Sequence, residues 1–203
     1  MADRVKQELL SRIMDGRLAP GTRIIELQIA EEMNTSQGPV REAFRELEAM
    51  DMIVTEPYKG TRVREATPRE IEDAYDVRAT LEQLAAELAA KHFKGNVEDL
   101  KRAALAVQGA AKRKDPRAYG TLDVKFHRMI VEATGNRALL RSWEALAYEL
   151  RIATRLGKGH VDLMAAQEVH WRVIELLEKG NGKAAGKILA GNVVTAFHQQ
   201  EKA

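Results

Sequence analysis

The sequence contains no cysteine and no long apolar run, and each absence excludes a class of protein. Without cysteine there is no disulfide, no thiolate zinc site and no cysteine nucleophile, so any metal would have to be held by His, Asp or Glu. No apolar run approaches the roughly 20 residues that a helix needs to cross a membrane. The first residues, MADRVKQELLSRIM, also lack the uninterrupted apolar segment of a signal peptide. We therefore expect a cytoplasmic protein that does not bind a membrane.

A strong excess of positive charge is also missing. The 203 residues carry a formal net charge of +2, so no broad basic surface indicates nucleic-acid binding. Residues 1–65 contain 10 Lys/Arg and 12 Asp/Glu, which gives this part a net charge of −2 and leaves +4 for the rest. If the first part binds DNA, its positive charge must be concentrated at a few positions.

The first 65 residues predict three helices followed by a hairpin. Hydrophobic periodicity and breaking residues place the helices at about 3–15, at about 26–33, and from the turn NTSQGP to about Met50. Residues 52–64 contain two short β-prone runs around a turn. The third helix carries one apolar stripe at helical spacing, made of Val40, Ala43, Phe44, Leu47 and Met50. This order of elements is typical of a winged helix-turn-helix.

A domain boundary is expected in the stretch REATPREIE. Thr67 can cap a helix that begins at Pro68, and Glu70 completes a Thr-x-x-Glu capping box. Beyond it, segments rich in Ala and Leu predict only helices, at about 68–92, 97–113, 116–134, 137–156, 161–179 and 182–200. The expected fold class is mainly α, with an N-terminal winged helix-turn-helix over 1–65 and an all-α antiparallel helical bundle over 66–203.

The start of the third predicted helix has the features of a DNA-reading end. If Ser36 is the N-cap and the apolar stripe packs inward, Gln37, Gly38, Arg41 and Arg45 lie near the outward side or at the exposed end. Free backbone N–H groups at a helix start can meet a phosphate, and side chains can reach base edges in the major groove. Double-stranded DNA is therefore the expected partner.

The hairpin loop YKGTR would form the wing of this reading head. Lys59 and Arg62 would contact backbone phosphates, and Gly60 would let the chain approach closely. Periodicity alone leaves an alternative open, in which the third helix has only a solvated face. On that face the two arginines would pair with neighbouring glutamates: Glu42, Glu46 and Glu48.

Resemblance to a known family favours the DNA-binding interpretation. The stretch IMDGRLAPGTRIIELQIAEEMNTSQGPVREAFRELEAMDMIVTEPYKGTRV closely resembles the DNA-binding domain of the GntR family of bacterial transcription regulators. The family's pattern runs from I-x-x-G-x-L-x-P-G through P-V-R-E-A to a wing glycine. It is carried here by Ile13, Gly16, Leu18, Pro20, Gly21, Glu26, Ala30, Ser36, Pro39, Val40, Arg41, Glu42, Ala43, Leu47, Gly60 and Val63.

One position departs from the family's pattern. Members usually carry Arg directly after the Ser, where this sequence has Gln37. Arg pairs in a bidentate manner with guanine, whereas Gln suits adenine, and one such contact discriminates by roughly 1–3 kcal/mol. We therefore expect an operator that differs from the family's common half-site at the position facing Gln37.

Three side chains of the helical part form a candidate metal site. Asp123 and His127 are four residues apart, so they project from one face of one predicted helix, and His170 lies in the middle of another. A carboxylate and two imidazoles that meet inside a bundle could bind Zn²⁺, Ni²⁺ or Mn²⁺ and leave positions open for water or a ligand carboxylate. Spacing alone leaves open that the Asp/His pair makes only a hydrogen bond.

The helical part resembles the FCD effector-binding domain of the FadR-like branch of GntR regulators. The resemblance lies in TPREIEDAYDVRATLEQLAAELAA, DVKFHRMIVEATGNRALL and EVHWRVIELLEKGNGKAAGKIL, and six helices make it similar to the VanR-type subgroup. The family usually supplies a further histidine ligand where this chain has Asn192, and His198 would lie on a different helix face. Since an amide oxygen is a poorer ligand than imidazole for a borderline metal, this site should bind its metal more weakly, and it would either be empty or hold a harder ion.

An effector pocket in the helical part would be lined by cations and aromatics. Arg78 borders an apolar stripe of Val77, Leu81, Leu84 and Leu88 and could clamp the carboxylate of a small organic acid, as the resemblance implies. An alternative for Arg78 is a surface pair with Glu82. Further candidates for the pocket wall are Trp143, Tyr148 and Arg151, whereas no chemical role is expected for His92 and His160.

Together these features predict a ligand-responsive transcriptional regulator, acting as a repressor, that binds operator DNA as a homodimer. One reading head with a net charge of −2 makes few phosphate contacts, and two-fold DNA sites suit a two-fold protein. The alternative is a metal-dependent hydrolase or lyase that uses Asp123, His127 and His170 around an activated water. Against an enzyme, we find no evident general base beside the three, no serine elbow and no glycine-rich phosphate loop.

Overall fold

The computed structural model describes residues 1–14, 16–156 and 162–201, and it describes their side chains except those of residues 14, 117, 147–156 and 194–201. The chain divides into two compact units. The first contains Met1–Pro68 and Arg151–Leu156, and the second contains Arg69–Leu150 and the described residues from 162 onward. None of the helices in these described ranges is long and apolar enough to cross a lipid bilayer.

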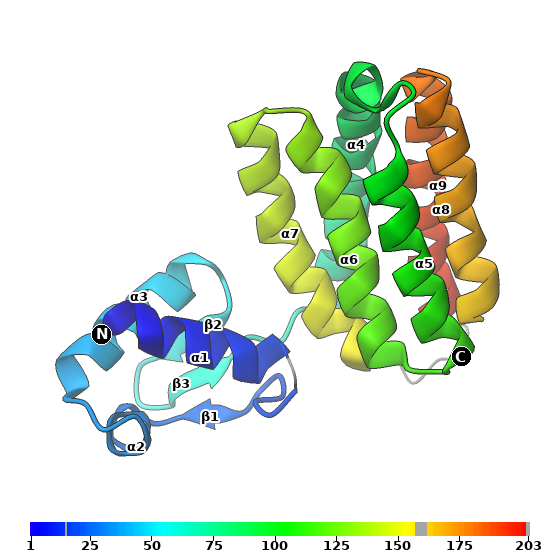
Figure 1. Cartoon of the computed structure of the whole chain (residues 1–203). Helices are drawn as coiled ribbons and strands as arrows, with labels where there is room; N and C mark the ends of the chain where they lie inside the picture. Colours follow the sequence, from blue (N-terminus) through cyan, green and yellow to red (C-terminus); the bar gives the residue numbers. More distant parts are fainter. Residues whose placement is uncertain (15, 157–161, 202–203) are drawn as a thin grey trace. The chain divides into compact units, whose positions relative to one another are not determined.

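The first unit is a helix-turn-helix followed by a small sheet (Figure 1). Its elements are α1 (Ala2–Met14), β1 (Arg23–Ile24), α2 (Glu26–Glu32), α3 (Gln37–Ala49), β2 (Ile53–Glu56) and β3 (Gly60–Val63). The strands lie in the order β1-β3-β2 and both pairs are antiparallel, with Ile53 opposite Val63. The predicted hairpin is thus present. Strand β1 was not predicted, because two residues are too few to show the alternation of apolar and polar residues that marks a strand.

The core of the first unit fixes which side of α3 faces outward. The buried residues of α3 are Val40, Ala43, Phe44 and Leu47, as predicted, and α3 packs on α1. Met50 was wrongly included in this stripe. It is 38% exposed because α3 ends at Ala49, so Met50 is the C-cap and no longer continues the helical face. With four apolar residues turned inward, the opposite side of α3 remains open to solvent.

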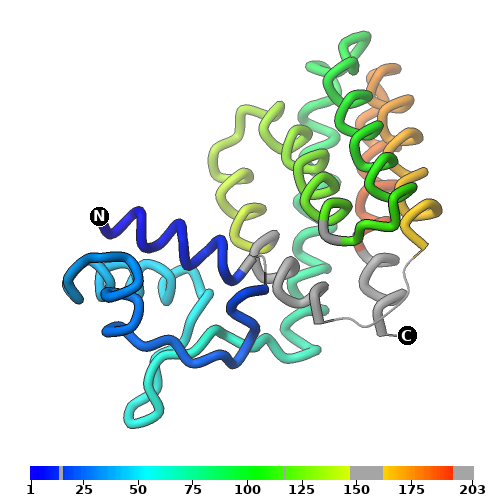
Figure 2. Tube along the Cα trace, turned by 60° about the horizontal axis from the view of Figure 1, so that its bottom comes forward, coloured from blue at the N-terminus to red at the C-terminus, as the bar shows by residue number. Residues whose placement is uncertain are grey.

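The second unit is a bundle of helices (Figure 1). These are α4 (Pro68–Phe93), α5 (Glu98–Lys112), α6 (Pro116–Ala133), α7 (Arg137–Leu156), α8 (Leu163–Glu178) and α9 (Gly182–Glu201). Each begins and ends within two residues of its predicted position. Within the bundle α5 packs against both α6 and α8, and α8 packs against α9 (Figure 2). The predicted fold class, a winged helix-turn-helix followed by a helical bundle, is confirmed.

Two glycines of α9 allow it to pack directly on the backbone of α4. A Cβ atom on Gly182 would lie 2.7 Å from the carbonyl oxygen of Ala86, and one on Gly186 would lie 2.7 Å from that of Gln83. Both distances are far below a normal van der Waals contact, so only glycine fits at either position. The facing side of α4 is correspondingly small, with Ala85, Ala86, Ala89 and Ala90 buried.

This close packing leaves the larger apolar residues of α4 outside the core. Of the apolar stripe that Arg78 was predicted to border, Val77, Leu84 and Leu88 are 50%, 43% and 49% exposed, and Leu81 is half-buried. The helix instead turns its alanine face inward, because α9 approaches too closely for leucine side chains. The stripe of Val77, Leu81, Leu84 and Leu88, here called the α4 stripe, therefore lies at the surface of this unit.

Candidate functional site

The N-terminal end of α3 is exposed, as a DNA-reading element requires. Ser36 is the N-cap, with extended backbone geometry, although its hydroxyl group makes no capping hydrogen bond. Ser36, Gly38, Arg41 and Arg45 are exposed and Gln37 is half-buried. The first-turn N–H groups and these side chains are thus placed where a duplex can reach them. Their contact with DNA remains a prediction.

Arg41 is held by neighbours from two helices. Its Nε donates a hydrogen bond to Glu26 Oε2 on α2 at 2.8 Å, and its Nη2 donates one to Gln37 Oε1 at 3.0 Å. The alternative of a purely solvated face expected pairing with glutamates of α3 itself. Two of those glutamates have other partners, because Glu46 pairs with Lys6 of α1 and Glu48 accepts a hydrogen bond from the backbone N–H of Thr55.

The wing presents two further cations. Lys59 and Arg62 are exposed, and Lys59 Nζ lies 2.8 Å from Glu56 Oε2 on the neighbouring strand. Gly60 has a φ of +81°, and a Cβ there would lie 3.3 Å from Nε of Arg23, so both conformation and space favour glycine. Lys59 therefore lies in the turn between β2 and β3, and Gly60 and Arg62 follow it on β3.

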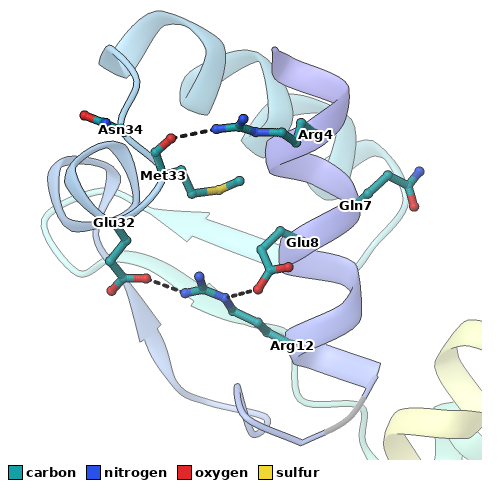
Figure 3. A pocket seen from close by; sticks show the side chains of 7 residues that line it. All are labelled: Arg4, Gln7, Glu8, Arg12, Glu32, Met33 and Asn34. Carbon is teal, nitrogen blue, oxygen red and sulfur yellow. Dashed lines mark hydrogen bonds and ion pairs between the residues drawn. The ribbon is translucent and has the colours of Figure 1, made fainter.

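A hollow on the first unit lies between α1 and the end of α2 (Figure 3). It is lined by Arg4, Gln7, Glu8, Arg12, Glu32, Met33 and Asn34. Arg4 Nη2 donates a hydrogen bond to the carbonyl oxygen of Met33 at 2.7 Å, and Arg12 bonds both Glu8 and Glu32. Because its arginines are bonded to its own wall, the hollow joins α1 to α2 rather than offering a binding site.

Asp123, His127 and His170 come together inside the bundle. One ligand atom from each lies within 4.8 Å of the others, and the two histidines are 2% and 0% exposed. His170 Nε2 is 3.1 Å from Asp123 Oδ1, and His127 Nε2 is 3.8 Å from the same oxygen. The shorter approach lacks hydrogen-bond geometry, so both ring nitrogens of buried His170 have no hydrogen-bond partner among the described residues. Such unpartnered nitrogens suit metal ligation.

Electrostatics keep the carboxylate of this cluster ionised. Burial by itself would raise the pKa of Asp123, but the neighbouring His127 and His170 outweigh it and hold that pKa below its ordinary value. Burial would likewise lower the pKa of His127, whereas Glu82 and Asp123 raise it above its ordinary value. An ionised carboxylate beside two imidazoles is a donor set for a divalent cation of borderline character.

Glu82 joins the metal cluster to Arg78 and Trp143. Its Oε1 accepts hydrogen bonds from Arg78 Nε at 2.7 Å and from Trp143 Nε1 at 2.9 Å, and its Oε2 lies 2.6 Å from His127 Nδ1. Although burial works to raise the pKa of Glu82, Arg78 and His127 lower it to about 2. From the sequence, Glu82 was predicted only as the possible partner of a surface arginine. The pair exists, but both residues are buried, so the surface alternative for Arg78 was wrong.

The other predicted positions are less informative. Asn192 is half-buried on α9, and its role as a ligand remains a prediction. The side chains of Tyr148, Arg151 and His198 lie outside the described residues, as does His160. Trp143 is 1% exposed and contributes its indole N–H to the buried network, so it belongs to both the core and the site.

Comparisons with known protein families agree with this geometry. The family model "Bacterial regulatory proteins, gntR family" matches residues 1–63, and the model "FCD domain" matches residues 73–193. Solved structures of similar fold include a putative transcriptional regulator GntR from Rhodococcus sp. RHA1, at a TM-score of 0.84 and 23% identity over 100% of this chain and 98% of that chain. E. coli McbR/YncC gives a TM-score of 0.83 at 21% identity over 98% of each chain.

Curated relatives of this chain are named as transcriptional repressors. The chain is 33% identical over 193 residues to a probable D-xylose utilization operon transcriptional repressor of Paenarthrobacter nicotinovorans, covering 95% of this chain and 85% of the relative. It is 33% identical over 144 residues to the gluconate operon transcriptional repressor of Bacillus licheniformis, covering 70% of this chain and 59% of the relative. None of these comparisons supports a hydrolase or lyase. A reading head and a helical domain that match these models in this order show that the chain belongs to the GntR family of bacterial transcriptional regulators that carry an FCD domain.

Proposed function

We propose that this regulator represses transcription by binding a two-fold operator as a homodimer, and that a small organic acid bound in the helical domain changes its affinity for DNA. The observation that carries this proposal is the start of α3, where Arg41 is exposed and Gln37 is half-buried, while the apolar stripe of the same helix is packed in the core. The matched models support domain limits of 1–65 and 66–203. The six helices α4–α9 in the described residues support the VanR-type subgroup.

In the proposed complex α3 enters the major groove with its N-terminal end first. Arg41 and Gln37 contact base edges, and the N–H groups at Ser36 and Gly38 meet a phosphate. Arg45 and the wing residues Lys59 and Arg62 bind the phosphate backbone. The ion pair between Arg41 and Glu26 does not prevent this, because an exposed pair contributes only about 0–1 kcal/mol and a phosphate can replace it.

Gln37 gives the proposed operator a specific difference. Where other members have arginine, the shorter amide of Gln37 favours adenine over guanine at the facing base pair. Selection from a random DNA pool should return a half-site that differs at this position from the one selected by the Gln37→Arg variant. An identical half-site for both proteins would remove this part of the proposal.

The α4 stripe supports the homodimer. Val77, Leu81, Leu84 and Leu88 are spaced by four, three and four residues, which is the spacing of a coiled-coil seam. The exposed side of α4 is acidic near its start, at Asp73 and Asp76, and basic near its end, at Lys91. Antiparallel pairing with a second copy would bury the stripe and place opposite charges near each other.

The buried cluster supports a metal-assisted effector site. Asp123, His127 and His170 would hold a divalent cation such as Zn²⁺, Ni²⁺ or Mn²⁺, which supplies a positive centre with open positions for a carboxylate. Asn192 would be a weak fourth ligand. Arg78 and Arg151 would bind the anionic effector, and the gluconate operon repressors among the relatives support a small organic acid.

A gel-shift titration tests the proposal most directly. DNA from upstream of the protein's own coding region is the probe, and candidate carboxylic acids are added at fixed protein concentration. We expect a retarded complex whose amount changes with one acid. Failure to bind any duplex at low salt would contradict the regulatory function itself, whereas binding that no acid changes would contradict only the proposed effector class.

Metal binding is tested separately. Elemental analysis of the purified protein should detect a divalent metal, and a chelator should lower its melting temperature. In the Asp123→Ala variant the metal content should fall and the chelator should have no effect. Absence of metal from the unsubstituted protein, together with unchanged melting after Zn²⁺ is added, would refute the metal site.

A further inference from the structure

Three hydrogen-bond donors converge on one carboxylate inside the bundle. Glu82 is 2% exposed and receives Arg78 from its own helix α4, His127 from α6 and Trp143 from α7. The bonds from Arg78 and His127 are 2.7 and 2.6 Å long, which is short for N–H···O hydrogen bonds and typical of charge-assisted ones, and the bond from Trp143 is 2.9 Å long. Glu82 therefore fixes three side chains at once.

The fold alone does not require a charge at this position. Apart from Tyr75, Arg78 and Phe93, the rest of the buried face of α4 is alanine. A buried ion network usually stabilises a fold no better than apolar side chains of similar volume. What such a network does provide is orientation, since each bonded group is restricted to one geometry. The role of Glu82 should therefore be sought in the residues it contacts.

Its contact with His127 determines which ring nitrogen faces the cluster. An ionised carboxylate only accepts hydrogen bonds, so Nδ1 of His127 must carry the proton in the bond to Glu82. In the neutral ring the free lone pair is then on Nε2. That atom lies 3.8 Å from Asp123 Oδ1, on the side where His170 Nε2 approaches the same oxygen. Glu82 thus aims one nitrogen of His127 at the centre of the three side chains.

Its contact with Arg78 orients the second part of the site. The bond from Arg78 Nε uses one edge of the guanidinium group, and Cζ of Arg78 lies over the Trp143 ring, 5.7 Å from its centroid. The indole N–H of Trp143 donates to the same carboxylate. The guanidinium can still offer the N–H groups of its terminal nitrogens to an anion. One carboxylate therefore holds both the cation-binding and the anion-binding groups.

We propose that Glu82 is a positioning residue that orients His127 for metal ligation through Nε2 and orients Arg78 as the anion clamp of the same site. This inference rests on the proposed function, because it takes Asp123, His127 and His170 as ligands of a divalent metal. Glu82 would thus control the affinity for both the metal ion and the anionic effector without contacting either of them.

Zinc affinity of the full-length protein is the first test, measured with Zn²⁺ alone in competition with a chromophoric chelator. The Glu82→Gln variant keeps the side-chain size, but its amide cannot accept all three hydrogen bonds, so zinc should bind roughly 10–100-fold more weakly. Glu82→Asp keeps the charge, so its zinc affinity should lie between those of the unsubstituted protein and Glu82→Gln. The matched control is Glu87→Gln on the same helix, where Glu87 is half-buried and accepts a hydrogen bond from Gln83; it should bind zinc normally.

Nitrogen NMR of the zinc-loaded unsubstituted protein is the second test, and it does not depend on the stability of any variant. The His127 ring should be protonated at Nδ1 and bound to zinc through Nε2. Ligation through Nδ1, or zinc affinity that Glu82→Gln leaves unchanged, would overturn the inference while leaving the metal site standing. No zinc binding by the unsubstituted protein would instead overturn the metal component of the proposed function, and the inference with it.

Discussion

The two units of the chain hold their charged groups in opposite ways. In the reading head Arg41 and Glu26 form a pair whose side chains are 59% and 36% exposed, so water or a phosphate can take the place of either partner. In the helical domain Arg78 and Glu82 form a pair that is 9% and 2% exposed, and no solvent is available to replace a lost partner. Exchangeable pairs suit a surface that must bind DNA, whereas a buried network suits a site whose geometry must stay fixed.

The largest expected effect is the loss of DNA binding when the reading head loses Arg41. Arg41→Ala should weaken binding to the selected operator by roughly 100-fold or more, because both subunits of the dimer lose a base contact worth about 1–3 kcal/mol. Fluorescence anisotropy with a labelled duplex measures this. Arg102→Ala, which removes an exposed arginine from α5, is the control and should bind normally. Equal affinity of the two variants would show that α3 does not read the DNA.

The next effect concerns the α4 stripe, which is apolar although it lies at the surface. Leu84→Glu places like charges opposite each other in the proposed homodimer and should shift the protein to monomer at micromolar concentration, as measured by analytical ultracentrifugation. Leu105→Glu changes an equally exposed leucine of α5 and should leave the dimer intact. A dimer that persists in Leu84→Glu would place the interface elsewhere, and a monomeric unsubstituted protein would refute the dimer itself.

Acid should distinguish a buried carboxylate from an exposed one. The pKa of Glu82 is lowered from 4.5 to about 2, so its ionised form stabilises the fold above pH 4.5, and this contribution is lost as the pH falls toward 2. The shift corresponds to about 3 kcal/mol of unfolding free energy. Urea unfolding between pH 7 and pH 2, with chelator present, should show a shallower loss in Glu82→Gln. Glu175→Gln, which removes an exposed partner of Lys179, should leave the profile of the unsubstituted protein unchanged.

The smallest effect should come from releasing Arg41 on the surface. Glu26→Gln removes the charge that holds Arg41 in the free protein, and operator affinity should change by less than about fivefold, in the direction of tighter binding. The anisotropy assay used for Arg41→Ala can resolve this. A loss of affinity comparable to that of Arg41→Ala would mean that Glu26 positions Arg41 for the DNA rather than competing with it.

Local patterns predicted most of the fold. Three helices of the bundle, α4, α6 and α8, each end shortly before a Gly-Asn pair in the sequence, and the four inward residues of α3 follow from periodicity. Strand β1 could not be recognised because it owes its existence to pairing with β3, almost 40 residues later. The outward position of the α4 stripe was also inaccessible, since it depends on which face α9 covers, and periodicity cannot tell a core face from an exposed one.

The candidate site was partly predictable for a similar reason. The i,i+4 spacing of Asp123 and His127 places them on one helix face. Their proximity to His170 depends on how the helices pack, and the structure shows it. Glu82 lies more than 40 residues from His127 in the sequence and shares no motif with it. Its one sequence signal was the spacing to Arg78, which is equally common on exposed helices.

Because Gly182 and Gly186 carry only a hydrogen atom in place of a side chain, the backbones of α9 and α4 are in direct contact at these two positions. A methyl group at either position would act as a wedge against the carbonyl groups of Ala86 and Gln83, the latter belonging to the residue next to Glu82. A larger separation of the two helices would move the carboxylate of Glu82, although none of the proposed ligand residues would have been substituted. Substitutions at these two glycines could therefore change the affinity for the metal ion and for the effector, although neither glycine contacts them.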